Sequence, residues 1–482
     1  MKRINQNYFS RIIGIATCTL MCVFASFSQE EEFTPAPVIV KDKALKSQIS
    51  KHYVVCTDNI DRNFSGLEET HLRGKMLKRK ESIYDLISEG KLIYTGELYE
   101  YVQGVANKVF AEDRKVYLIR SESPDAYNIG DDNLFVHIGL LERLSNEDEL
   151  AYVLGHLIAH NELDHFEERM VGAMNLHEDA VMEELIEKIK MKEYCPVSDM
   201  SRLMVPWVLT RDLTSKKQET DADAFACLKM KDAGYDPSKV GGVFEILDHN
   251  ESNITGTSFD INRILGLEQM RSNFSKELNF AAASASVVVK VGGSEIDKLR
   301  LHAFSVDRKK AFVKTFGENA ENLADETYLT YQGFARKEVI VHAIKEGEIE
   351  VALFYLFQVH QQDSTDLFSR KLIPFCFAYL GLEKKRDQSE KPVGFESLES
   401  NENYNRTISF LESLEVEQCI EITEYWNTRV ERDLEKYLKN ANEAVLSLIK
   451  EDIQTFDLQL MRENDPRYSY LPEVLKKLAK NK

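Results

Sequence analysis

The sequence predicts a mainly α-helical protein with one small β-sheet and an α-helical C-terminal region. Three patterns lead to this fold class. Apolar residues recur at helical spacing in residues 98–109, which places them on one face of a helix. Two short β-forming runs, 116–119 and 134–136, flank a polar stretch and predict a small sheet that leans on helices. From Gly333 onward the apolar pattern is that of successive helical hairpins.

The composition is that of a globular protein with a sizeable core. The chain has 482 residues, of which 43% are hydrophobic and 29% are charged. Its formal net charge is -19 at pH 7. This acidity argues against nucleic acid or an anionic membrane surface as a partner.

Residues 1–28 have the pattern of a secretory signal peptide. Basic residues precede a mostly apolar run, 12–27, and small residues at 26–28 provide a cleavage site. The apolar run is short for a membrane span, and acidic residues follow it directly. We therefore expect an exported protein, periplasmic in preference to extracellular, and find no firm indication of membrane binding. An uncleaved N-terminal anchor is the alternative.

The rest of the chain divides into five predicted segments. The first is expected to be an extended lead-in, because it contains two prolines and a strand-like run. The last is expected to end in a frayed, lysine-rich tail. In order, the segments are the N-terminal lead-in (29–75), the domain with the sheet (76–300), helical hairpins (301–383), a polar linker (384–406) and a C-terminal helical region (407–482).

The hairpin region contains a repeat-like pattern. Residues 345–356 have the glycine and alanine spacing of a tetratricopeptide turn and its second helix. Residues 377–381 are similar to the start of the same turn, about 34 residues later. The region is therefore predicted to be partly tetratricopeptide-like, with plain bundle packing as the alternative.

A predicted helix in the sheet-containing domain carries two histidines. Ser145 or Asn146 is a suitable N-cap for this helix. His156 and His160 are four residues apart, so their imidazoles lie on one face, one turn apart. Two such rings can share a tetrahedral metal such as zinc, although two ordinary core histidines would show the same spacing.

Residues 219–237 predict a second helix with two acids on one face. Glu219 and Asp223 are at positions i and i+4. Gly234 is placed to end the helix, and Pro237 prevents the helix from resuming. A carboxylate that a second helix brings to two histidines completes a His2Glu metal site.

Leu157 occupies the position on which catalysis depends. In the pattern His-Glu-x-x-His, the residue after the first histidine is a glutamate that serves as general base. Leucine cannot abstract or donate a proton, and general acid–base assistance contributes about 10²–10⁴-fold to a rate. Ideal helix geometry turns Glu162 away from the site and places Glu149 about 10 Å along the axis. The sequence therefore predicts a site without a base.

Together, these motifs resemble metallopeptidase family 48, the family of HtpX, BepA and the CAAX prenyl proteases. Residues 154–160 (Leu-Gly-His-Leu-Ile-Ala-His) fit the family's L-G-H-E-x-A-H at all but one position, and residues 219–223 fit its E-x-x-A-D. Residues 301–308 are faintly similar to a later H-P…R segment, with alanine in the place of the proline. The resemblance covers residues from about 95 to 240 and implies a zincin-like peptidase domain.

The resemblance implies one zinc ion held by His156, His160 and Glu219. It makes Asp223 a group that orients a ligand imidazole, and it makes Leu157 the replacement of the family's general base.

Two other positions carry expectations. Residues 125–132 depart from the pattern of the strand that covers the cleft in the family. His165 lies about 180° round an ideal helix from His156, so we expect it at the surface or behind a ligand.

The sequence thus predicts an exported member of this family that binds zinc but is catalytically impaired. Such a pseudoprotease would act by binding a polypeptide substrate or client, as an adaptor or a chaperone-like factor. Two alternatives remain open. One is an active zinc endopeptidase that cleaves misfolded or envelope proteins with a non-standard base. The other is a metal-free helical scaffold.

Overall fold

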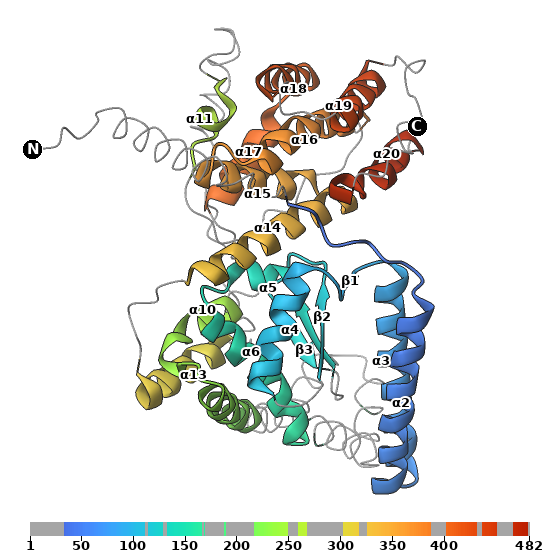
Figure 1. Cartoon of the computed structure of the whole chain (residues 1–482), viewed down its shortest axis with the longest axis vertical. Coiled ribbons are helices and arrows are strands. Elements are labelled where there is room, and N and C mark those ends of the chain that lie inside the picture. Colours follow the sequence, from blue (N-terminus) through green and yellow to red (C-terminus); the bar gives the residue numbers. More distant parts are fainter. Residues whose placement is uncertain are drawn as a thin grey trace, which may run out of the picture.

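The computed structural model shows a mainly α-helical protein with one four-stranded sheet, as predicted (Figure 1). The predicted signal peptide at 1–28 lies outside the described residues, as does a loop or inter-domain joint expected at 280–300. Of a largely helical stretch expected at 170–218, the structure describes residues 188 and 216–218, which are helical. The structure describes residues 33–110, 114–128, 133–165, 168, 188, 216–248, 259–267, 302–317, 325–386, 402–430, 436–450 and 466–480.

The sheet is small and mixed, with strand order β1-β2-β4-β3. The two predicted strands are β2 (Lys115–Ile119) and β4 (Asn133–His137), which pair in parallel. The sequence did not predict β1 (Leu92–Ile93) or β3 (Ala126–Asn128), which pair antiparallel at the two sides. Both are too short to show an alternating pattern, and β3 lies inside the polar stretch.

Helices cover both faces of this sheet. Tyr117 and Ile119 of β2 pack against α2 (Lys43–Asn63) and α3 (Leu67–Ser88), which stand side by side in Figure 1. The alternate residues Val116 and Leu118 join the larger core on the opposite face. Successive side chains of a strand point to opposite faces, so one short strand serves both layers.

The opposite face carries the two helices around which this domain is built. The apolar positions predicted for 98–109 are buried in α4 (Glu97–Val109). The histidine helix is α6 (Glu147–Glu162), and it begins as predicted at Asn146, whose side chain accepts from the backbone N–H of Glu149. The Glu149 carboxylate in turn accepts from the backbone N–H of Ser145. These reciprocal bonds fix the first turn of α6.

The C-terminal region is a helical bundle, and its helix α14 (Glu326–Glu346) makes an extensive contact with the sheet-containing domain. Helix α14 packs on α5 (Ile138–Arg143). Further helices in the described ranges include η1 (Pro237–Lys239), α10 (Gly241–Asp248), α11 (Ile261–Leu265), α13 (His302–Phe316), α15 (Ile349–Gln362), α16 (Leu367–Arg386), α17 (Glu402–Ser413), α18 (Val416–Val430), α19 (Lys436–Ile449), η6 (Pro466–Tyr468) and α20 (Leu471–Lys480).

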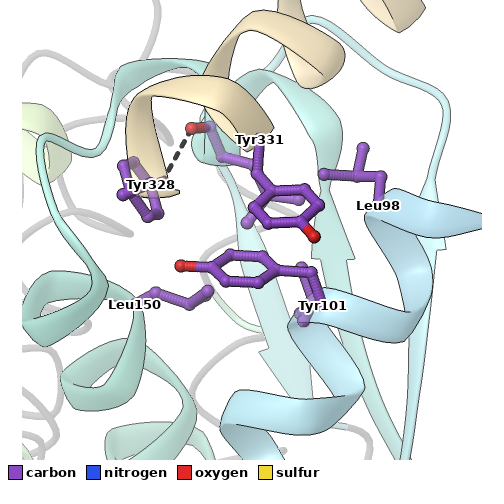
Figure 2. Close-up of a pocket in the computed structure, with 7 residues that line it drawn as sticks. Leu98, Tyr101, Leu150, Tyr328 and Tyr331 are labelled. Atoms are coloured by element: carbon purple, nitrogen blue, oxygen red, sulfur yellow. Dashed lines mark hydrogen bonds between the residues drawn. The ribbon is translucent and has the colours of Figure 1, made fainter. Parts of the chain in front are cut away.

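Tyrosines fill the junction beneath α14. Figure 2 shows Tyr328 and Tyr331 of α14 facing α4 and α6. The rings of Tyr331 and Tyr101 stack with centroids 3.8 Å apart, and the Tyr328 hydroxyl donates to the carbonyl of Leu141 at 2.9 Å. The seam has no room for a ligand. Close packing of this kind makes the bundle and the sheet-containing domain one continuous core.

The prediction that residues 29–75 form an extended lead-in is wrong, because α2 and the first part of α3 lie within this range. Asp42 caps α2 by accepting from the N–H of Leu45, and the two prolines affect only the segment before it. Leu45, Ile49 and Tyr53 are buried at helical spacing. This one-sided apolar pattern is typical of a helix that packs against a core.

The second tetratricopeptide-like turn, predicted at 377–381, is also wrong. The first turn is present, with Gly347 at φ 90° between α14 and α15. However, α16 continues through Gly381. A Cβ at Gly381 would lie 3.0 Å from the Cβ of Cys419, so this glycine allows α18 to approach closely and does not end a helix.

The predicted linker (384–406) and frayed tail are helical where they are described. Lys384, Lys385 and Arg386 donate to carbonyls near the ends of α17, α19 and α20, so these basic residues cap neighbouring helices. The tail forms α20, whose apolar residues at helical spacing are buried against α14 and α19. Among the described helices, none has the length and apolar character needed to cross a bilayer.

A buried arginine ties the N-terminal segment to both parts of the molecule. Arg120 is 1% exposed and donates to four backbone carbonyls, while Glu338 of α14 lies 3.9 Å away and accepts from the N–H of Ala36. The four carbonyls belong to Ala36, Pro37, Gly90 and Leu92.

We predict that Arg120→Met lowers the free energy of unfolding by about 3–5 kcal/mol, because it leaves several buried carbonyls without their donor and the buried Glu338 carboxyl without its neighbouring cation. Chemical denaturation measures this change. Arg73→Met is the control, since Arg73 forms an exposed ion pair with Asp61 and should leave the unfolding curve unchanged. Similar curves for the two variants would contradict the prediction.

Candidate metal centre

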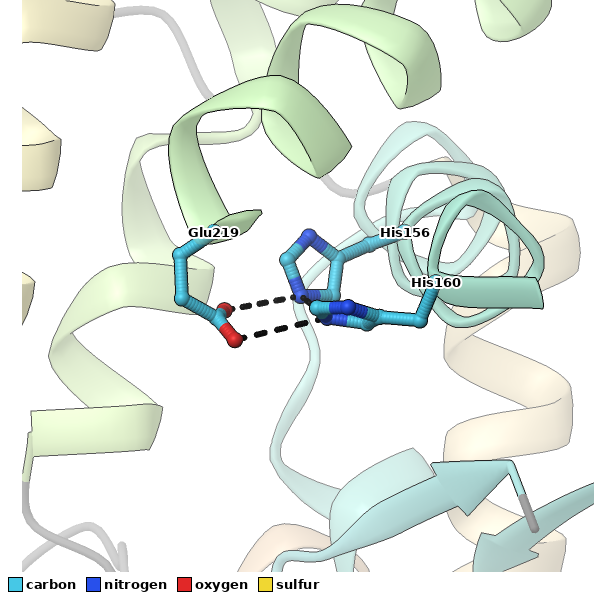
Figure 3. A group of neighbouring side chains, drawn as sticks. All are labelled: His156, His160 and Glu219. Carbon is cyan, nitrogen blue, oxygen red and sulfur yellow. Dashed lines mark hydrogen bonds and ion pairs between the residues drawn. The ribbon is translucent and has the colours of Figure 1, made fainter. Parts of the chain in front are cut away.

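Two imidazoles and one carboxylate converge between α6 and a helix that includes residues 216–232 (Figure 3). The Nε2 atoms of His156 and His160 lie 3.1 Å apart. The carboxylate of Glu219 lies 3.2 Å from Nε2 of His156 and 3.4 Å from Nε2 of His160. The structure therefore brings together the three residues predicted as ligands, from positions more than fifty residues apart in the sequence.

A glycine allows the two helices to approach so closely. A Cβ at Gly155 would lie 3.2 Å from the Cα of Ala226, so a larger side chain would push the helices apart. Gly234 ends the second helix at φ 90°, as predicted. Gly155 directly precedes His156 in the sequence. The close approach that this glycine allows therefore lets Glu219 reach the histidines.

The three donor groups fit a metal ion. Tetrahedral zinc with ligand bonds of about 2.0–2.1 Å separates its ligand atoms by about 3.3 Å. The separations of 3.1, 3.2 and 3.4 Å are close to this value. Nitrogen and carboxylate oxygen are also the donors that zinc accepts. Within the described part of the chain, His156, His160 and Glu219 form the one group of this kind.

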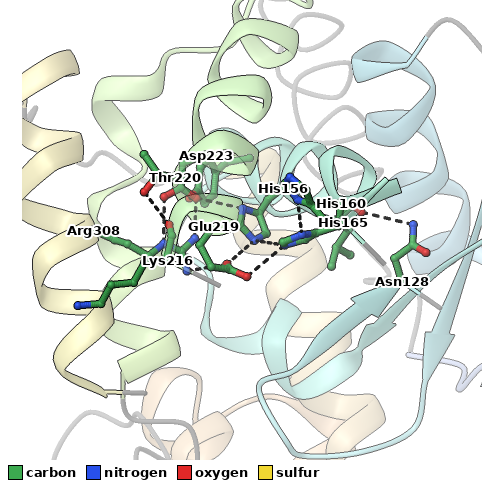
Figure 4. Close-up of polar contacts among 11 residues, drawn as sticks. Asn128, His156, His160, His165, Lys216, Glu219, Thr220, Asp223 and Arg308 are labelled. Atoms are coloured by element: carbon green, nitrogen blue, oxygen red, sulfur yellow. Dashed lines mark hydrogen bonds and ion pairs between the residues drawn. The ribbon is translucent and has the colours of Figure 1, made fainter. Parts of the chain in front are cut away.

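A second set of residues holds this group from behind (Figure 4). Asp223 lies 3.0 Å from Nδ1 of His156 and accepts from the hydroxyl of Tyr152 at 2.6 Å. Arg308 donates twice to Asp223, at 2.5 and 2.9 Å, and its third nitrogen lies 3.1 Å from Glu219. Asp223 therefore occupies the orienting position that the resemblance implied.

The buried charges change one another's pKa values. Burial opposes ionisation of Glu219, but His156, Arg308 and His160 outweigh it and lower its pKa to about 2. Burial likewise opposes ionisation of Asp223, but His156 and Arg308 hold the pKa of this carboxyl well below its usual range. Burial lowers the pKa of His156, yet Asp223 and Glu219 raise it overall. Both carboxyls are thus ionised at neutral pH.

The base position is occupied by a core leucine. Leu157 is 6% exposed and belongs to the core. Its carbonyl accepts from the side chain of Asn128 on β3. The two glutamates considered as replacements are engaged elsewhere: Glu149 at the start of α6, and Glu162 in an ion pair with Arg114.

A family model matches part of the sequence. Residues 93–305 match the model of peptidase family M48. These residues belong to peptidase family M48. The M48 match begins at β1 and includes α6 and Glu219, so the metal group lies inside it. No curated protein matches the sequence significantly.

Two residues of the candidate site carry little or no signal in the sequence. Arg308 lies just beyond the matched segment, and its one indication is the faint similarity of 301–308 to a family motif. Tyr152 stands one turn before His156, and no motif marks it. His165, expected at the surface or behind a ligand, is 4% exposed and lies behind the candidate ligand His160.

We predict that Arg308→Met lowers the free energy of unfolding of the metal-free protein by about 3–5 kcal/mol, because two buried carboxylates lose their cation. Chemical denaturation measures the change. Lys309→Met is the matched control on the same helix. Lys309 pairs with the exposed Glu245, so its loss should cost less than about 1 kcal/mol. A stable Arg308→Met variant would show that the network does not depend on this arginine.

The depressed pKa of Glu219 predicts a pH dependence in the metal-free protein. A lowered carboxyl pKa contributes stability above its ordinary value of 4.5, and this contribution is lost as the pH falls towards about 2. We therefore expect the stability difference between wild type and Glu219→Gln to shrink between about pH 5 and pH 2.5. Denaturation curves at several pH values test this, and a constant difference would contradict it.

Proposed function

We propose that this protein is a zinc-binding pseudopeptidase of family M48 that binds polypeptides and does not cleave them efficiently. One observation carries the proposal: an intact ligand group stands beside a base position occupied by a buried leucine. A zinc ion held by His156, His160 and Glu219 would supply Lewis acidity to a water or a carbonyl group. Proton transfer would still require a side chain that can act as a general base, and leucine cannot do so.

The surrounding contacts support retained metal binding without catalysis. Asp223, Tyr152 and Arg308 hold the ligands through side chains that do not involve Leu157. Metal affinity depends on ligands and on the groups that orient them. The rate of hydrolysis depends in addition on the missing base, whose absence should lower it by about 10²–10⁴-fold.

An edge strand beside the site supports polypeptide as the ligand. In the described sheet, β3 stands at one end of the strand order, so it pairs with β4 on one side. Asn128 of β3 contacts the carbonyl of Leu157, which places this strand next to the base position. An extended peptide can add to such an edge through backbone hydrogen bonds. Adaptor or chaperone-like activity follows if the bound chain is released uncut.

We also propose export, on the basis of the signal pattern in residues 1–28. Periplasmic residence is the expected destination, ahead of the extracellular medium. N-terminal sequencing of the protein from the envelope fraction should find Gln29 as the first residue. An intact N-terminus on a membrane-bound product would instead favour the uncleaved anchor.

Restoring the missing base tests the central proposal. Leu157→Glu should gain zinc-dependent hydrolysis of an unfolded protein substrate by at least about 10²-fold over wild type. Leu157→Gln is the matched control, because it has the same shape as the glutamate and lacks the base. Wild type should contain zinc, bind a fluorescent unfolded polypeptide and leave it uncut.

Three outcomes would decide against the proposal. Efficient cleavage by wild type, abolished by a chelator, would establish an active endopeptidase with a non-standard base. Zinc content no higher than that of His156→Ala would favour the metal-free scaffold. Failure of wild type to bind the unfolded polypeptide would remove the proposed adaptor role.

A further inference from the structure

His165 lies behind a candidate ligand, which is the second of the two places expected for it. On a continuous helix it would lie about 180° round the axis from His156. Instead α6 ends at Glu162, and a turn at Leu163 and Asp164 folds the next residue back. His165 is consequently buried, with 4% of its surface exposed, beside the ring of His160.

The two rings meet through one nitrogen each. Nδ1 of His165 lies 3.1 Å from Nδ1 of His160. The other nitrogen of His160, Nε2, faces His156 and Glu219 (Figure 4). The imidazole of His160 therefore has one nitrogen in the candidate metal group and the other against His165.

Proton placement follows from this contact. Two facing Nδ1 atoms can form a hydrogen bond only when one carries a proton and the other does not. A metal ligand needs its lone pair on Nε2, so a neutral His160 must carry its proton on Nδ1. His160 is then the donor, and Nδ1 of His165 is the acceptor.

We propose that His165 is a positioning residue for the metal centre, which fixes the tautomer and the ring orientation of His160. Metal-bound histidines generally donate their second N–H to a carboxylate, a carbonyl or water. Here Asp223 performs this role for His156, and His165 performs it for His160. The two ligands of α6 are thus held by different chemical groups.

The backbone gives independent support. Asp164 has φ 54°, and Lys41 is the other non-glycine residue with positive φ in the described ranges. This left-handed conformation is unfavourable for residues with a side chain, although aspartate tolerates it better than most. Strained backbone of this kind persists where the surrounding structure requires it. Here it directs His165 towards His160.

The proposal rests on the zinc binding in the proposed function, and it is tested by zinc affinity and by the visible spectrum of the Co²⁺-substituted protein. His165→Leu removes the acceptor and should weaken zinc binding about 10–100-fold and alter the Co²⁺ spectrum. His165→Asn keeps an acceptor oxygen near the position of Nδ1 and should retain most of the affinity. Equal losses in both variants would overturn the acceptor role.

A backbone pair tests the same contact without changing His165. Asp164→Gly keeps the left-handed turn accessible and should leave zinc affinity unchanged. Asp164→Val disfavours the turn and should weaken zinc binding in the same way as His165→Leu. Circular dichroism verifies that each variant is folded, and the Asp164 pair decides the question if His165→Leu does not fold.

The outcomes separate this role from the proposed function. Wild-type zinc affinity and an unchanged Co²⁺ spectrum in folded His165→Leu would overturn the positioning role alone. The absence of zinc binding in wild type would overturn the proposed function and the positioning role together.

Discussion

The contact of Arg308 with two carboxylates is the interaction on which the candidate metal centre depends. Glu219 and Asp223 are both largely buried, and two anions one helical turn apart repel each other strongly when water is excluded. A planar guanidinium can bind one carboxylate with two donors and still reach a second. The same cation therefore makes burial of both acids tolerable and holds Glu219 towards the histidines. It also links α13 to α6 through the shared site.

The fold supplies the rigid elements that this network needs. The helices carrying the ligands approach closely at Gly155 and Ala226, and α6 is fixed at its start by Asn146. At the far end, the turn at Asp164 directs His165 to the back of His160. Each ligand is therefore constrained by a group outside the ligand set, which is the arrangement that precise metal sites require.

A leucine at position 157 is compatible with this architecture because the residue is outside the supporting network. Its side chain belongs to the core, and its carbonyl accepts from Asn128 of the edge strand. A leucine there adds apolar packing and removes one charge, while the contacts of Asp223, Arg308 and Tyr152 are unaffected. The domain can therefore keep its ligand geometry and its strand edge with a leucine at this position.

The sequence by itself determined the features that depend on local periodicity. The apolar spacing predicted α4 and α6, the i and i+4 positions placed His156 with His160 and Glu219 with Asp223, and Gly234 marked a helix end. The prediction that Leu157 stands in place of the base likewise came from the sequence, because a motif position needs no tertiary information. Helical periodicity is also present in α2 and α20, but the prolines before α2 and the lysines of α20 led to other predictions for these segments.

Only the tertiary structure decided which distant groups meet. No spacing rule predicts the contact between Arg308 and Glu219. Nor does one predict that Gly381 lets α18 approach closely at a position where a turn was expected. Both contacts join segments that are far apart in the sequence. His165 shows the same limit at short range. Its direction depends on a single left-handed residue, and a helix projection that assumes continuous α6 turns the side chain away. Contacts between elements, and the backbone breaks that aim side chains, depend on packing that is absent from the linear pattern.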